Sequence, residues 1–126
     1  MPLPATRASV LIVEDDASLL GALVFALRAD HYEVHGHRTA NRALADLRSC
    51  DCLVIDLKLP DMDGLTLIDQ LRELGVQAPA ILITTNPDER SRRRAARAGV
   101  TIVEKPLMGG TLGAHVATAI GRPQTN

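Results

Sequence analysis

Residues 52–64 read CLVIDLKLPDMDG, and this stretch decides the fold. It opens with a continuous apolar run at positions 52–55, reaches a carboxylate at Asp56, and then gathers the proline, aspartate and glycine residues that are typical of a turn. An apolar run without alternation is typical of a strand buried on both faces, as in a parallel sheet. The stretch therefore predicts a central strand that ends on an acidic residue and leads through a turn into the next element.

Short apolar runs and helix-length apolar stripes alternate on both sides of this stretch. Runs at 10–13 and 80–83 predict two further buried strands, and the more polar runs at 32–35 and 101–103 predict strands at the edges of the sheet. Strands that alternate with helices are typical of an α/β fold with a parallel sheet. The apolar positions that predict the intervening helices are Leu19, Leu20, Leu23, Val24 and Leu27; Ala40, Ala43, Leu44 and Leu47; Leu67, Ile68, Leu71 and Leu74; and Leu112, Val116, Ala119 and Ile120.

The length and composition predict a single domain. The chain of 126 residues is 46% hydrophobic and 23% charged, which fits one domain over residues 1–126 with a core of about 9–120. Its ends, Met1–Ala8 and Gly121–Asn126, are expected to be short flexible tails. The net charge of −1 argues against a globally basic nucleic-acid-binding protein. The uncharged apolar stretch 17–27 is too short to span a membrane and the chain does not begin like a signal peptide, so a cytoplasmic location is expected.

Polar side chains follow the predicted strands at the edge where parallel strands end. Glu14 and Asp15 follow the first strand, Asp56 ends the third, Thr84 ends the fourth and Lys105 follows the fifth. In a sheet of order 2-1-3-4-5 the first and third strands are neighbours, so Asp15 and Asp56 meet where open α/β sheets bind ligands. Such crowded carboxylates either keep a proton or are neutralised by a divalent cation, and all-oxygen ligands suit Mg²⁺. Thr84 and Lys105 are then placed to bind oxygens of a phosphoryl group on Asp56.

Residues 86–99 predict an arginine-rich fourth helix. Asn86 is the expected N-cap, Pro87 takes the first helical position, and Gly99 is expected to end the helix. The last helix carries three glycines near its beginning, which predict that it frays or starts late. The arginines of the fourth helix that are expected to share one solvent-facing side are Arg90, Arg93, Arg94 and Arg97.

Taken together, these residues resemble the receiver domains of two-component response regulators. The resemblance covers nearly the whole chain and rests on four features in order: the acidic pair Glu14–Asp15, Asp56 in the run DLKLPDMDG, Thr84, and Lys105 followed by a proline. It implies a flavodoxin-like (βα)5 fold, in which a doubly wound five-stranded parallel sheet has the order 2-1-3-4-5. Because receiver-like elements fill the chain, we expect a stand-alone regulator with no output domain.

The resemblance also implies a reaction. Asp56 would attack a phosphohistidine on a sensor histidine kinase or a histidine phosphotransfer protein. Mg²⁺ would be held by Asp15, Asp56 and the backbone carbonyl of Lys58, and Glu14 would reach the metal through water. The protein would not be an enzyme beyond catalysing its own phosphorylation and dephosphorylation.

The resemblance implies an output surface as well. Thr84 and Lys105 would draw on the aspartyl phosphate and shift the face formed by the fourth helix, the fifth strand and the fifth helix. That face would dock an unidentified downstream protein. It is also where two copies would pair, so a monomer or a weak homodimer is expected.

Several positions depart from the family pattern. Ile102 stands where many receivers have the aromatic residue of the switch, and a side chain without a polar tip cannot exchange one hydrogen bond for another. The segment 99–105 is one residue shorter than usual. Thr85 adds bulk beside the phosphorylation pocket. Lys58 and Asn86 occupy positions that tune the loss of the phosphoryl group, and the lysine predicts a rather long-lived phosphoprotein.

Other interpretations of these residues stay open. Asp15 or Asp16 could cap the first helix, and Asp56 could serve only in a turn. A second hypothesis is a receiver-like adaptor whose arginine-rich fourth helix binds an acidic partner whatever the state of Asp56. DNA binding through that helix ranks last because the chain is slightly acidic. A phosphatase or kinase acting on other substrates is set aside, because position 58 is a lysine and no glycine-rich phosphate loop follows the first strand.

Overall fold

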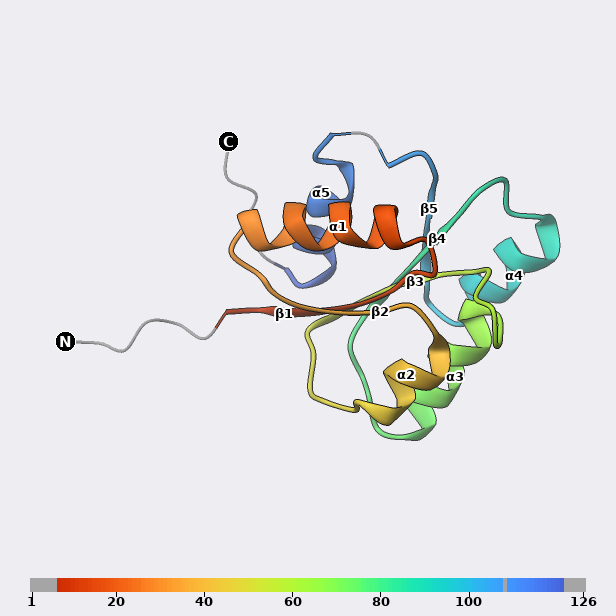
Figure 1. The fold of residues 1–126 in the computed structure, drawn as a ribbon. Helices are drawn as coiled ribbons and strands as arrows, with labels where there is room; N and C mark the ends of the chain where they lie inside the picture. Colours follow the sequence, from red (N-terminus) through yellow and green to blue (C-terminus); the bar gives the residue numbers. More distant parts are fainter. Residues whose placement is uncertain (1–6, 108, 122–126) are drawn as a thin grey trace.

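The structure, a computed structural model, describes residues 7–107 and 109–121. Its five strands are parallel and form one sheet in the order β2-β1-β3-β4-β5 (Figure 1), which confirms the predicted topology. The elements in chain order are β1 (Ser9–Val13), α1 (Ala17–Ala29), β2 (Glu33–His37), α2 (Ala40–Ala45), β3 (Cys52–Asp56), α3 (Gly64–Glu73), β4 (Ala80–Thr84), α4 (Glu89–Arg97), β5 (Thr101–Glu104) and α5 (Thr111–Ala119).

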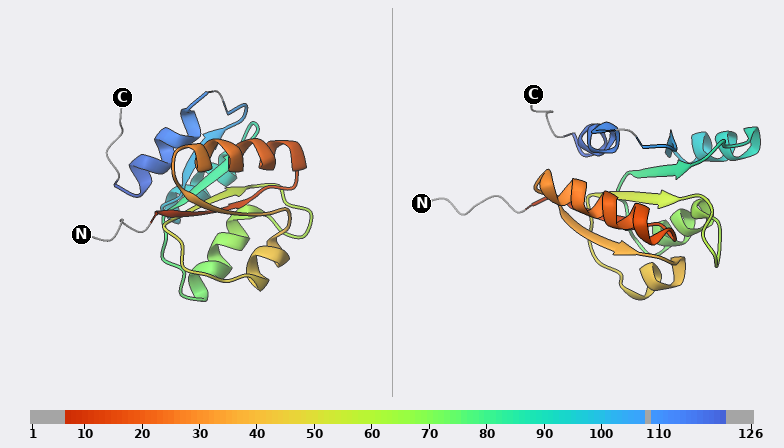
Figure 2. Two further views of the ribbon diagram at one scale, coloured as in Figure 1. Left: turned by 60° about the vertical axis from the view of Figure 1, so that its left-hand side comes forward. Right: turned by 45° about the horizontal axis from the view of Figure 1, so that its top comes forward.

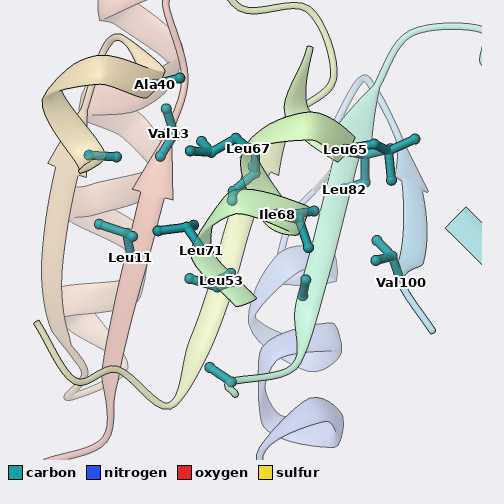
Figure 3. Close-up of a cluster of buried hydrophobic side chains, with 14 of the residues drawn as sticks. Leu11, Val13, Ala40, Leu53, Leu65, Leu67, Ile68, Leu71, Leu82 and Val100 are labelled. Atoms are coloured by element: carbon teal, nitrogen blue, oxygen red, sulfur yellow. The ribbon is translucent and has the colours of Figure 1, made fainter. Parts of the chain in front are cut away.

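Helices cover both faces of the sheet. α1 and α5 lie on one face, and α2 and α3 lie on the other, with α4 beside α3 (Figures 1 and 2). Because successive side chains of a strand point to opposite faces, each central strand supplies two apolar clusters. In β3, Leu53 and Ile55 join the cluster under α3, whereas Cys52 and Val54 join the cluster under α1 and α5. Figure 3 shows the first cluster, in which side chains of α3 such as Leu71 pack against the strands.

The burial of the strands follows their place in the sheet. Every residue of β1, β3 and β4 is buried, as the continuous apolar runs predict. The outer strands β2 and β5 mix buried and exposed residues, which confirms that they are the edges. The sequence pattern therefore predicted which strands are central and which lie at the edges.

The beginning of α4 differs from the prediction. The helix starts at Glu89, and its N-cap is Asp88, whose carboxylate accepts the backbone N–H three residues further on at 2.8 Å. Asn86 is therefore not the cap and Pro87 is not in the helix. Asn86 has φ +52°, the left-handed conformation that asparagine adopts more readily than most residues, whereas an N-cap needs an extended backbone. The predicted end is confirmed, since Gly99 follows the helix with φ +68°.

The start of α5 and the extent of the tails can be compared with the prediction. α5 begins at Thr111, after two of the three glycines, and its N-cap residue Gly110 has no side chain to cap the helix, which agrees with the predicted late start. The carbonyl of Ala8 accepts a hydrogen bond from β2 at 2.9 Å, so this residue belongs to the sheet region and not to the tail. Most of both predicted tails, 1–6 and 122–126, lies outside the described residues. Within the described part of the chain, no helix is long and apolar enough to cross a membrane.

Candidate functional site

The candidate site lies at the carboxyl ends of the strands. Asp56 is the last residue of β3, Thr84 is the last residue of β4, and Lys105 directly follows β5. β1 pairs with β3, so Glu14 and Asp15, which follow β1, lie beside Asp56. The sheet order therefore brings together all five residues that were expected to meet.

Three carboxylates form the acidic part of the site. Glu14, Asp15 and Asp56 each offer a carboxylate oxygen, and these oxygens lie within 4.8 Å of one another. Glu14 is completely buried, Asp56 is 4% exposed and Asp15 is exposed. Partial loss of solvent raises the pKa of Asp15, and the neighbouring carboxyl of Glu14 raises it further. Oxygen ligands so arranged form an acidic cluster that could hold a divalent cation.

Lys105 provides the positive charge of the site. Its Nζ lies 2.8 Å from Glu14 Oε1 and 3.1 Å from Asp56 Oδ2. Burial alone lowers the pKa of Lys105, but hydrogen bonds to Glu14 and Asp56 outweigh it and raise the pKa. The side chain therefore stays an ammonium. The shorter segment 99–105 still lets the lysine reach Asp56, and its backbone N–H donates to the carbonyl of Thr84 at 2.8 Å.

The expected switch and tuning residues lie at or after the ends of β3 and β4. Thr84 is buried, and within the described residues its hydroxyl makes a single long contact, 3.5 Å from the carbonyl of Thr85. Thr85, Asn86 and Lys58 are exposed. The backbone N–H of Lys58 donates to Asp56 Oδ1 at 3.2 Å, so this residue touches the acceptor through its main chain.

The loop between β3 and α3 is shaped by contacts that the sequence did not predict. The turn was expected, but a Cβ atom at Gly64 would lie 2.3 Å from the backbone oxygen of Asp56, so only glycine fits at this position. The carboxylate of Asp61 accepts the backbone N–H groups of Ala40 and Asn41 at 3.0 and 2.8 Å and so anchors the loop to α2. The Asp-Gly pair at 63–64 was the sequence feature that could have indicated this close contact, but it predicted no more than a turn.

The capping interpretation holds for one of the two aspartates after β1. The carboxylate of Asp16 accepts the backbone N–H of Leu19 at 3.0 Å and is the N-cap of α1. Asp15 instead belongs to the acidic cluster. Neighbouring aspartates thus have separate roles at the same helix terminus.

The arginines of α4 do not share one role. Arg94 was expected beside the solvent-facing arginines, but it is partly buried and its guanidinium reaches Asp63 on α3 at 3.1 Å. Arg92 pairs with Glu104 of β5. The arginines that are exposed and form neither a hydrogen bond nor an ion pair within the described ranges are Arg90, Arg93 and Arg97.

Position 102 differs from the usual switch as the sequence predicted. Ile102 is partly buried and packs against the apolar cluster on the α3 side of the sheet. Its side chain offers no hydrogen bond that could follow a movement of Thr84. A signal from the site to α4 therefore needs other contacts.

Comparisons with known proteins agree with this geometry. The family model described as the response regulator receiver domain matches residues 10–117. The response regulator protein TodT of Pseudomonas putida is 38% identical over 105 residues, which cover 80% of this chain and 46% of TodT. The transcriptional regulatory protein FixJ of Rhizobium meliloti is 36% identical over 106 residues, which cover 81% of this chain and 52% of FixJ.

Solved receiver domains share this fold, and the curated relatives are longer than this chain. The crystal structure of a CheY-like receiver domain protein from Methanospirillum hungatei superposes with a TM-score of 0.87 at 25% identity and covers 92% of this chain and 95% of that chain. The chain spans about half the length of the curated relatives it matches, 46% of TodT and 52% of FixJ. With its fold, its strand-end residues and a family match over most of its length, the chain belongs to the response regulator receiver domain family of two-component signalling.

Proposed function

We propose that the protein accepts a phosphoryl group on Asp56 from a histidine kinase or a histidine phosphotransfer protein, and then signals by docking onto another protein. Receiver domains as a family accept phosphoryl groups from histidine kinases. One observation carries the proposal for this chain: a carboxylate oxygen of Asp56 lies within 4.8 Å of oxygens of two other carboxylates, and Asp56 Oδ2 lies 3.1 Å from the ammonium of Lys105. This is the setting in which a carboxylate can attack phosphorus while a fixed positive charge receives the transferred oxygens.

The transfer is a displacement at phosphorus. A carboxylate oxygen of Asp56 forms the new P–O bond, the P–N bond of the phosphohistidine breaks, and the electron pair leaves with the imidazole. The ammonium of Lys105 is held at the acceptor, where it can bind a phosphoryl oxygen. Among the described residues the hydroxyl of Thr84 makes a single long contact, so it is available to turn toward the phosphoryl group.

The residues of the acidic cluster fit a magnesium ion. Glu14, Asp15, Asp56 and the backbone carbonyl of Lys58 would hold it, because Mg²⁺ prefers oxygen ligands and keeps several waters. The raised pKa of Asp15 supports this assignment, since a cation would relieve the repulsion between crowded acids. When bound, the ion would neutralise charge on the transferring phosphoryl group.

Intact-mass measurement tests the proposal directly. The protein is incubated with Mg²⁺ and acetyl phosphate, and the wild type is expected to gain one phosphoryl group. Asp56→Ala should gain none, whereas Glu73→Ala, which removes an exposed carboxylate at the end of α3, should react like the wild type. Chelation of Mg²⁺ should abolish the adduct. An unmodified wild type, or an adduct that persists in Asp56→Ala, would contradict the proposal.

We expect the phosphoryl group to be long-lived. The exposed ammonium of Lys58 lies two residues after the acceptor and can pair with the phosphoryl oxygens, which hinders attack by water. Lys58→Ala should therefore shorten the half-life, measured as the decay of the mass adduct after the donor is removed. Loss of the adduct within seconds from the wild type would argue against this role.

A second candidate function is docking to an acidic protein through α4 whatever the state of Asp56. The observation in its favour is that Arg90, Arg93 and Arg97 are exposed and unpaired within the described ranges, and their spacing puts them on one stripe of the helix. Arg90→Glu with Arg93→Glu should abolish binding of a polyglutamate peptide, and Arg42→Glu on α2 serves as the control. Binding that vanishes in Asp56→Ala would exclude this candidate.

A further inference from the structure

The C-terminal part of α4 is attached to both ends of α3 by arginine side chains. At the start of α3, Arg94 of α4 donates from Nη1 to Asp63 Oδ1 and Oδ2 at 3.2 and 3.1 Å and from Nη2 to Thr66 Oγ1 at 3.0 Å. At the end of α3, Arg72 donates to the carbonyl of Ala98, the C-cap residue of α4. The two helices lie side by side in Figure 1. The position of α4 is therefore tied to α3 by specific polar contacts as well as by apolar packing.

Asp63, the residue that Arg94 holds, fixes the start of α3. Its carboxylate also accepts the backbone N–H of Thr66 at 2.8 Å and is the N-cap of the helix. Partial burial alone would raise the pKa of Asp63, but the hydrogen bonds from Thr66 and Arg94 lower it, so the side chain stays an anion. One carboxylate thus serves the helix cap and the bond to α4 together.

The start of α3 in turn presses against the acceptor residue. Gly64 donates its backbone N–H to the carbonyl of Leu57 at 2.7 Å, and a Cβ atom at Gly64 would lie 2.3 Å from the backbone oxygen of Asp56. Lys58 pairs with Asp63 in an isolated antiparallel bridge. The acceptor backbone and the first turn of α3 are therefore in close contact, so a shift of one is expected to move the other.

These contacts form a continuous path from the acceptor to α4. Asp56 Oδ1 accepts the N–H of Lys58 at 3.2 Å, Lys58 pairs with Asp63, and Asp63 is held by Arg94. Formation of an aspartyl phosphate turns one carboxylate oxygen into the bridging oxygen of a mixed anhydride and removes the negative charge of the carboxylate, which changes what the Lys58 N–H binds. Ile102 offers no polar contact for the usual route, whereas the contacts of this path are present in the described part of the chain and can carry the change to α4.

We propose that Arg94 is a positioning residue that locks the start of α3 against Asp56 and links α4 to the acceptor loop. The coupling to phosphorylation rests on the proposed function, in which Asp56 is the acceptor. The locking of the loop does not, because the contacts exist in the unmodified protein. Energetic coupling between two parts of a protein is reciprocal, so loss of the contact that holds α4 must also loosen the loop between β3 and α3.

Hydrogen exchange of the unphosphorylated protein tests the lock. Arg94→Met removes the guanidinium and keeps the apolar stem, and it should speed the exchange of the amides of residues 57–66 by about two- to fivefold. Asp63→Asn, which can still cap α3, should do the same, and the double variant should add nothing further. Arg93→Met should leave these amides unchanged, because this exposed arginine of the same helix forms no hydrogen bond or ion pair with the residues that the structure describes. Equal exchange in Arg94→Met and Arg93→Met would overturn the proposal.

Phosphorylation tests the link in a way that a purely structural role would not affect. With Mg²⁺ and acetyl phosphate, exchange of the α4 amides should change in the wild type and in Arg93→Met, but not in Arg94→Met, although all three show the mass adduct on Asp56. Arg94→Lys should retain part of the response. An α4 response that survives in Arg94→Met would refute the link. A wild type that takes up no phosphoryl group would refute the proposed function, while the exchange of residues 57–66 would still decide whether Arg94 locks the loop.

Discussion

Lys105 is the residue on which the charge balance of the site depends. Its ammonium contacts Glu14 and Asp56 at 2.8 and 3.1 Å, and both carboxylates are almost completely removed from solvent. A buried carboxylate is stable as an anion only when a positive charge or several hydrogen bonds compensate for lost water. The lysine was predicted because it follows a strand end. Its simultaneous contact with two acids was not, because that depends on the path of the backbone after β5.

Removal of this charge should destabilise the protein. We expect Lys105→Met to lower the free energy of unfolding by about 2 kcal/mol or more, because two buried carboxylates lose their counter-ion while the apolar stem is kept. Urea denaturation of both proteins measures the difference. Lys58→Met, which removes an exposed lysine two residues after Asp56, should change stability little. Similar losses in the two variants would mean that the Lys105 pairs are no stronger than a solvent-exposed contact.

Glycine at position 64 is required by space. Gly64→Ala places a Cβ atom 2.3 Å from the backbone oxygen of Asp56, so the loop or the helix must shift, at a cost of about 1–3 kcal/mol and with slower phosphorylation. Gly21→Ala is the matched control. No atom lies within 4 Å of a Cβ there, and alanine in the middle of α1 should stabilise the protein by about 0.5–1 kcal/mol. Thermal unfolding should therefore move in opposite directions in the two variants.

At the scale of elements, α4 shows why the ends of helices are harder to predict than their existence. Asn86 and Asp88 are both good N-cap residues, and Pro87 between them favours a first helical position after Asn86. Only the backbone decides between them, and Asn86 takes the left-handed conformation at φ +52°. The bond between Arg94 and Asp63 escaped prediction for a related reason. Periodicity tells which face of a helix is polar, but not which residue of another helix lies opposite.

The cap on α4 makes a pH-dependent contribution to stability. The hydrogen bond from the backbone N–H of Ser91 lowers the pKa of Asp88 below its ordinary value of 3.8. A depressed pKa of an acid stabilises the fold above the unfolded value and loses this effect as the pH falls through the folded value. Asp88→Ala should therefore lower Tm at neutral pH, and the difference from the wild type should shrink below pH 3.8. Asp88→Asn, which caps without titrating, should keep most of the Tm at neutral pH; a loss as large as that of alanine would contradict the capping role.

At the scale of the whole molecule, the sheet separates two apolar clusters and its order determines the site. The continuous apolar runs predicted β1, β3 and β4 as central strands, and the strand-end residues then predicted which side chains would meet. This worked because parallel strands end at a common edge, so the neighbours in the sheet follow from topology alone. What topology does not contain is how a helix packs against another helix or against the loop at a strand end, and the contacts of Arg94 and Gly64 are of these two kinds.

The interior and the end of α3 should respond very differently to truncation. Leu71 is fully buried in the cluster of Figure 3. Leu74 was predicted on the same apolar face, but it is the C-cap residue that follows the helix and is 57% exposed. Leu71→Ala should cost about 2–5 kcal/mol, because it leaves a cavity in a close-packed core. Leu74→Ala should change the free energy of unfolding by less than about 0.5 kcal/mol. Equal effects in denaturant unfolding would contradict the observed orientation of α3.

The two cysteines should react with a thiol reagent at very different rates. Cys52 lies in the central strand β3 with no exposed surface, and burial raises the pKa of its thiol to about 12. Cys50, two residues earlier, is only partly buried, and burial raises the pKa of its thiol as well. Because a thiol reagent needs both access and a thiolate, Cys50 reacts through small local openings and Cys52 only when β3 leaves the sheet. The labelling rate of Cys52 therefore measures how often the sheet opens globally. The labelling rate of Cys50 serves as an internal reference for the reactivity of the reagent.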